Sequence, residues 1–351
     1  MWHEVGHLSK VPVFVELCAG TAALSLRLAR SKARPPVSRM GAKTGYADAI
    51  LLRMGLQAGQ GADGYLWCEP DAGVRLLLHA YTDRRLARAA AEVVRGWAED
   101  EPRALWERLK AEGPVKAPEP REVARWVYAA ATSYKASTPF SGFVHPEQGG
   151  RYGASRADQV RRLDDLPELP GCIVPDATEV DPREVARWAF IANASWRKGD
   201  PASGYDPRRA EERPATDTGG RQPALTEALP PRLDALPELP ARLMPDASEV
   251  EPARLPAGSW VYIDPPYVGT TGYAHDLPRA EVVRLARLWR DAGAHVAISE
   301  AEPIAELVAD GWHAHELTAE RVGQKRTFSK QQREWLTMTR APRGQLGLWG
   351  S

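Results

Sequence analysis

The nine residues Ser259-Trp260-Val261-Tyr262-Ile263-Asp264-Pro265-Pro266-Tyr267 decide the fold of this chain. The first five are mostly β-branched or aromatic, which predicts a buried strand. The acid and the two prolines end that strand abruptly, because proline cannot donate to a sheet ladder. Open α/β sheets bind ligands at the carboxyl ends of their strands. We therefore expect a carboxylate, a proline carbonyl and an aromatic ring at such an edge.

The tetrapeptide Asp264-Pro265-Pro266-Tyr267 carries the groups that an exocyclic amine on a nucleobase needs. Asp264 can accept one N–H, the Pro265 carbonyl can accept another, and the Tyr267 ring offers a flat face for stacking. The motif therefore predicts methylation of a base amine. A turn that merely closes a strand is the structural alternative for an isolated occurrence.

Two earlier segments end in acidic or small residues in the same way. The apolar strand around Val13 to Val15 passes through Glu16 to Ala23 into a helix-like stretch, which is the layout of a nucleotide-binding βα unit. A second predicted strand, Gly64 to Cys68, is followed by Glu69, at a position where a cofactor ribose is commonly held. Alternation of strands and helices along the chain predicts an α/β fold with a mostly parallel, Rossmann-like sheet.

Bulk composition is that of an ordinary globular protein. The chain has 351 residues, 43% of them apolar, and its formal net charge is +0. No apolar stretch approaches the length of a membrane span, and the three cysteines and eight histidines show no convincing ligand spacing. We expect no membrane segment, no metal, a cytoplasmic location, and a monomer or a weak dimer.

The middle of the chain contains an internal repeat. Arg121–Trp126 recurs as Arg183–Trp188, at an offset of 183 − 121 = 62. Leu166–Pro170 and Pro175–Val180 recur at an offset of 70, as Leu236–Pro240 and Pro245–Val250. One tandem duplication with a later insertion explains two unequal offsets better than a solenoid does. Only the second copy leads straight into the strand before Asp264, so we expect Asp246 to be functional and Asp176 to be its spare.

Basic residues gather in two places despite the neutral total. Arg208 and Arg209 lie in a polar, loop-like segment from Lys198 to Leu229, and Lys325, Arg326 and Lys330 lie in a basic run from Arg321 to Arg343. Such a run is usually a solvated face. The alternative is a surface that contacts nucleic-acid phosphates, and we carry these five residues as candidates for it.

Taken together, these motifs resemble the Dam-like family of DNA methyltransferases that act on the exocyclic amine of adenine. The likeness spans almost the whole chain. Glu16 to Ala23 is similar to the family's cofactor loop, with Gly20 at its first glycine and Ala22 where a second is usual. Phe140–Phe143 and Arg333–Thr337 resemble shorter family motifs. Gly41-Ala42-Lys43 resembles an element that normally precedes the cofactor loop, whereas here it follows.

The resemblance implies a site-specific methyltransferase that uses S-adenosylmethionine, flips its target base out of double-stranded DNA and needs no metal. The residues implied in cofactor binding are Glu16, Cys18, Gly20, Thr21, Lys43, Glu69 and Asp246, and the catalytic ones are Asp264, Pro265, Pro266 and Tyr267. We expect a cofactor half in residues 1–100, a mainly helical target-recognition region in 101–230 and a catalytic half in 231–351. The alternatives are a cytosine-N4 methyltransferase and an inactive relative that only binds nucleic acid.

Overall fold

The chain has an α/β fold built on one seven-stranded sheet. A computed structural model describes residues 10–37, 42–114, 116–133, 140, 142–145, 155–194, 254–267, 277–317 and 333–342. The strand order is β3-β2-β1-β4-β5-β7-β6. The strands are β1 (Val11–Leu17), β2 (Ala62–Cys68), β3 (Gly171–Val174), β4 (Trp260–Ile263), β5 (His295–Glu300), β6 (His313–Glu316) and β7 (Trp335–Met338).

The sheet is mostly parallel. β1 pairs in parallel with β2 and β4, β2 with β3, and β4 with β5, whereas β7 runs antiparallel to both β5 and β6. The chain winds outward from β1 to β3 and then returns to place β4 on the other side of β1. The strand order therefore reverses between β1 and β4, which is where open α/β sheets form a ligand crevice. The expected α/β fold with a mostly parallel sheet is confirmed.

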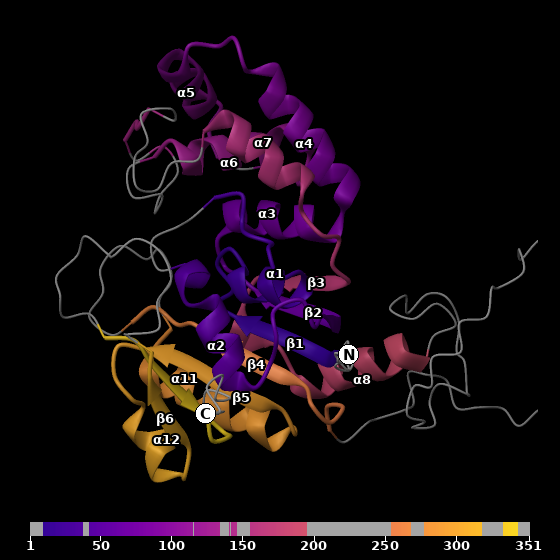
Figure 1. Ribbon diagram of the computed structural model, residues 1–351, viewed down its shortest axis with the longest axis vertical. Helices are drawn as coiled ribbons and strands as arrows, with labels where there is room; N and C mark the ends of the chain where they lie inside the picture. Colours follow the sequence, from indigo (N-terminus) through magenta and orange to yellow (C-terminus); the bar gives the residue numbers. More distant parts are fainter. Residues whose placement is uncertain are drawn as a thin grey trace, which may run out of the picture.

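Helices cover both faces of the sheet (Figure 1). Residues of β1 alternate between the two cores, with Phe14 in one and Val13 and Val15 in the other, as the two-residue period of a strand requires. On the Phe14 face lie α1 (Ala23–Ala29), α2 (Ala47–Met54) and α3 (Ala72–Thr82). On the other face lie α8 (Pro182–Ala194), α11 (Arg279–Asp291) and α12 (Ala305–Ala309).

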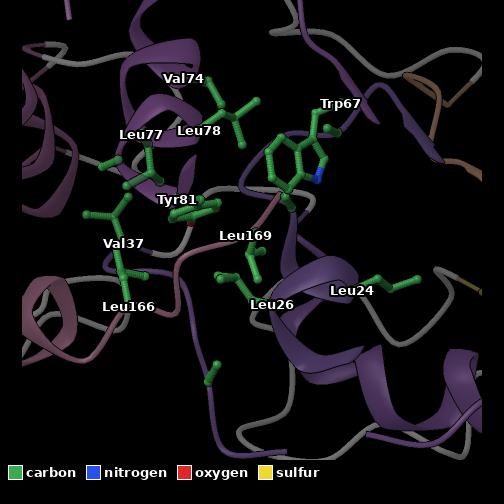
Figure 2. Close-up of a cluster of buried hydrophobic side chains, with 14 of the residues drawn as sticks. Leu24, Leu26, Val37, Trp67, Val74, Leu77, Leu78, Tyr81, Leu166 and Leu169 are labelled. Carbon is green, nitrogen blue, oxygen red and sulfur yellow. The ribbon is translucent and has the colours of Figure 1, made fainter. Parts of the chain in front are cut away.

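The first core is anchored by large side chains around the end of β2. Figure 2 shows Trp67 and Tyr81 among leucines of α1 and α3, with Leu166 and Leu169 closing the cluster. The Trp67 ring stacks on Tyr65 at a centroid distance of 5.8 Å and meets the Tyr81 ring edge-on at 6.3 Å. Full burial of one such side chain contributes about 1.5–3 kcal/mol. This packing fixes the turns that follow β1 and β2.

A helical unit is inserted between α3 and β3. It comprises α4 (Arg84–Gly96), α5 (Pro102–Ala111), α6 (Pro120–Ala131) and α7 (Arg156–Asp164). Figure 1 shows these helices beyond α3, at the opposite end of the molecule from α12. Side chains of Asp83, Glu101 and Ser155 cap three of the helices at their N-termini, which satisfies amide groups that the helix leaves unpaired.

The helical unit begins before residue 100, with α4. β3 and α8 lie within 101–230 and form part of the sheet and its covering layer. Helix and strand patterns alone do not reveal which element packs on which.

The two repeated helices occupy different places, and the tryptophan of each one is a packing residue. Trp126 in α6 is 3% exposed, and Trp188 in α8 lies against Gly64 of β2.

Within the described ranges, none of the helices has the length and apolarity needed to cross a membrane. The same residues contain no group of three or more histidine, cysteine or acidic side chains that could hold a metal ion.

Candidate active site at the carboxyl ends of β1 and β4

A strained turn follows β1. Cys18, Gly20 and Ala22 all adopt left-handed backbone conformations, with φ of 60°, 52° and 47°. Such a conformation costs about 1–3 kcal/mol for a residue other than glycine and is concentrated at functional sites. The Ala19 N–H donates to the Cys68 carbonyl over 2.9 Å, which ties the turn to the end of β2. A Cβ on Gly20 would meet no atom within 4 Å, so the turn borders open space.

Glu69 holds the turns after β1 and β2 together. One of its carboxylate oxygens accepts from the Gly20 N–H over 2.7 Å, and the other accepts from the Asp71 N–H over 3.0 Å. Sequence patterns did not indicate this structural role, and the expected contact of Glu69 with a ribose stays a prediction.

Glu16 faces the start of α1. It is 2% exposed, and its Oε1 accepts from the amide of Ser25 over 2.7 Å and from the Ser25 hydroxyl over 2.5 Å. The Trp67 indole N–H donates to the same hydroxyl over 2.8 Å. Burial raises the pKa of Glu16 to about 7, against the opposing effect of the Ser25 hydrogen bonds. Glu16 thus anchors α1 under the turn, and its expected contact with the cofactor stays a prediction.

Asp264 lies directly beside this turn. Its backbone N–H donates to the Leu17 carbonyl over 3.2 Å, since β4 is the parallel neighbour of β1. The Cys18 thiol lies between several acids: burial raises its pKa, and the charges of Glu69, Asp264 and Asp176 raise it further. This edge of the sheet is therefore acidic. At the same turn, Thr21 is 2% exposed, and its hydroxyl has no hydrogen-bond partner among the described residues.

A buried charge network surrounds the tetrapeptide. The Lys43 ammonium lies 2.8 Å from Asp264 Oδ1 and 3.3 Å from Glu334 Oε1, and it donates to the Tyr267 hydroxyl over 2.6 Å. It also sits 4.6 Å from the centroid of the Tyr267 ring. The Tyr267 hydroxyl donates a short hydrogen bond to Glu334 Oε1. The fold thus brings Lys43, predicted as a cofactor contact, to the tetrapeptide Asp264 to Tyr267.

Burial controls the protonation of this network. Only 20% of the Asp264 side chain is exposed, and desolvation raises its pKa to about 6 although the Lys43 ammonium opposes that effect. The charge of Glu334 raises the pKa of Asp264 further. Burial likewise raises the pKa of the Tyr267 hydroxyl above its usual range. Asp264 is therefore a carboxylate at neutral pH that can take up a proton within the physiological range.

The first repeat copy supplies the third strand of the sheet. β3 pairs with β2 and is followed by Asp176, which accepts from the Thr178 amide and hydroxyl, each over 2.8 Å. The pairing of β3 with β2 brings Asp176 to this edge of the sheet. The preference for Asp246 over Asp176 rested on the nearness of Asp246 in sequence to Asp264, and it stays a prediction because Asp246 lies outside the described residues.

Several predicted residues lie outside the described ranges, so their roles stay predictions. These are Asp246, Arg208, Arg209, Lys325, Arg326 and Lys330. Conversely, sequence analysis assigned no role to Glu334. Its signal was an acid directly before the apolar strand β7, but nothing local indicates that it meets Tyr267, which is 67 residues away.

Comparison with known proteins adds no assignment. No protein-family model matches the chain. A search of curated proteins likewise finds no match. The site must therefore be interpreted from its own geometry.

Proposed function

We propose that the protein is an S-adenosylmethionine-dependent DNA methyltransferase that acts on the exocyclic amine of adenine. One observation carries this proposal: the backbone of Asp264 is hydrogen-bonded to Leu17, so the tetrapeptide stands beside the strained turn at the point where the strand order reverses. That point is the expected ligand crevice of an open α/β sheet. The strand order, with an antiparallel β7, is compatible with the methyltransferase fold that the sequence resemblance implies.

The residues at this edge fit the proposed cofactor. The acidic cluster of Glu69, Asp176 and Asp264 around Cys18 suits a cationic ligand, and Gly20 leaves open space beside the turn. Glu69 would accept from ribose hydroxyls, and Asp176 takes the place that sequence analysis gave to Asp246. When bound, the cofactor supplies an electrophilic methyl group on a sulfonium centre. Charged acceptors make the stronger hydrogen bonds to such a ligand.

The tetrapeptide would act on the target amine by orientation and electrostatics. The Asp264 carboxylate accepts one N–H and the Pro265 carbonyl accepts the other, which aims the nitrogen lone pair at the methyl carbon. As the new C–N bond forms and the C–S bond breaks, the amine must lose one proton. Asp264 can hold that proton transiently, because its pKa is about 6. Tyr267 would stack on the flipped base, a contact of about 1–3 kcal/mol.

The test is methyl transfer by purified protein to duplex DNA of mixed sequence, with digestion to nucleosides and mass spectrometry. We expect methylated adenine, and a rate lower by roughly 10²–10³-fold for Asp264→Ala. Asp291→Ala serves as the control, because Asp291 is exposed and pairs only with its neighbour Arg290 among the described residues.

Other outcomes of this assay assign the alternatives. Methylated cytosine would assign the cytosine-N4 activity. DNA binding without cofactor uptake would assign an inactive relative. Unmodified DNA in the presence of folded, cofactor-bound protein would refute the proposal.

A further inference from the structure

The Lys43 ammonium occupies the position that the proposed function gives to the target amine. It donates to Asp264 over 2.8 Å and to the Tyr267 hydroxyl over 2.6 Å, with its nitrogen 4.6 Å from the ring centroid. A base amine held by Asp264 would use the same acceptor. Lys43 must therefore release Asp264 when the base enters, and a buried ammonium needs another acceptor at that moment.

Glu334 provides that acceptor. Its side chain is fully buried, and its Oε1 lies 3.3 Å from the Lys43 ammonium while it accepts from the Tyr267 hydroxyl. The Glu334 carbonyl accepts from the Leu317 amide over 2.7 Å, and the next residue, Trp335, pairs with β5 and β6. The sheet thus fixes the backbone of Glu334, and its carboxylate is fully buried, whereas 20% of the Asp264 side chain is exposed.

We propose that Glu334 is a positioning residue that retains Lys43 and fixes the Tyr267 ring while the target amine replaces Lys43 on Asp264. This inference rests on the proposed function. In the free protein Lys43 is shared by two carboxylates. When the base is bound, Lys43 stays paired with Glu334, so no charge is left buried alone. Without the Glu334 charge, Lys43 would pair more strongly with Asp264 and compete with the substrate.

Glu334→Gln tests the inference, since glutamine keeps the shape and still accepts from the Tyr267 hydroxyl. We expect the KM for DNA to rise roughly tenfold, the effect of one charge-assisted hydrogen bond, with a smaller change in kcat. Glu316→Gln is the matched control, because Glu316 is exposed on the adjacent strand β6. Its kinetics should equal those of the wild-type protein.

The pH profile supplies a second readout that a merely structural role would not move. The acidic limb of kcat/KM should lie at lower pH in Glu334→Gln, because the Glu334 charge raises the pKa of Asp264. The other groups that influence this site stay unchanged in the variant: Lys43, Glu300, Glu16, Cys18, Tyr262 and Tyr267. A KM and an acidic limb indistinguishable from those of Glu316→Gln would overturn the inference.

A double-mutant cycle separates this inference from the proposed function. Lys43→Met, Glu334→Gln and the double variant are compared by urea unfolding, which needs no activity. Either single change leaves a buried charge with one partner fewer. We therefore expect the unfolding equilibrium constant of the double variant to be at least about tenfold smaller than the value calculated by adding the effects of the two single variants. Additive effects would overturn the pairing. An inactive wild-type protein with a coupled cycle would refute methyl transfer while supporting the retention of Lys43 by Glu334.

Discussion

Gly171→Ala should destabilise the edge of the sheet at β3. A Cβ at residue 171 would lie 2.2 Å from Cζ3 and 2.5 Å from Cη2 of Trp67, where ordinary contacts begin at 3.4 Å. The Trp67 ring cannot yield easily, because it is fully buried, stacked on Tyr65 and hydrogen-bonded to Ser25. An overlap above 1 Å with a fixed ring belongs at the upper end of overpacking costs, about 3 kcal/mol.

This substitution also tests which repeat copy suits the third strand. The residue that repeats Gly171 is Ala241, since 171 + 70 = 241, so the second copy carries the methyl group that Trp67 excludes. Urea unfolding is the assay, and with a slope of about 3 kcal/mol/M the midpoint should fall by about 1 M. Gly96→Ala is the control, because a Cβ there meets nothing within 4 Å, and it should be neutral or stabilising. A midpoint for Gly171→Ala equal to that of wild type would refute the steric argument.

Three further predictions follow from buried charges. Methyl transfer should decline as pH falls through about 6, because protonation of Asp264 removes its acceptor; a rate independent of pH between 5 and 8 would contradict this role. For Glu16, the folded protein binds an extra proton between pH 4.5 and about 7, so the free energy of unfolding of the wild-type protein should fall by about 3 kcal/mol as pH rises through that window. In urea unfolding, Glu16→Gln should weaken the dependence of stability on pH. An unchanged pH dependence would exclude Glu16 as its source. Arg125→Met should cost about 3–5 kcal/mol, because the buried guanidinium binds the carbonyls of Leu109 and Gly113 at the end of α5. The exposed control Arg108→Met should cost less than about 1 kcal/mol in the same assay.

Local patterns were sufficient to predict the central strands and the position of the tetrapeptide. β1, β2 and β4 are apolar runs that end in an acid or a sharp turn, and parallel pairing brings their carboxyl ends to one edge. β3 was harder to predict because Gly171–Val174 is a short, half-buried edge strand with a near-copy 70 residues later. The feature that we expect to distinguish the two copies is the close approach of Trp67 to Gly171, which is a property of tertiary packing.

Local sequence patterns could not predict the charge network either, because it too depends on tertiary packing. Lys43 and Tyr267 are 224 residues apart, and Tyr267 and Glu334 are 67 apart. Sequence motifs marked Lys43 and Tyr267 separately, as a cofactor contact and a stacking ring. Only the order of strands β1, β4, β5 and β7 brings the four charged and phenolic groups together. The two hydrogen bonds that Glu69 accepts from backbone amides likewise form only when the turns are folded.

We propose above all that Asp264, beside the turn after β1, directs methylation of an adenine amine. The most direct measurement is to express the protein in a host that lacks adenine methylation and to sequence the host DNA for modified bases. The account predicts methylated adenine within a short sequence motif, and its loss with Asp264→Ala. Unmodified adenine in cells that contain the folded wild-type protein, or methylation that persists in the Asp264→Ala variant, would contradict it.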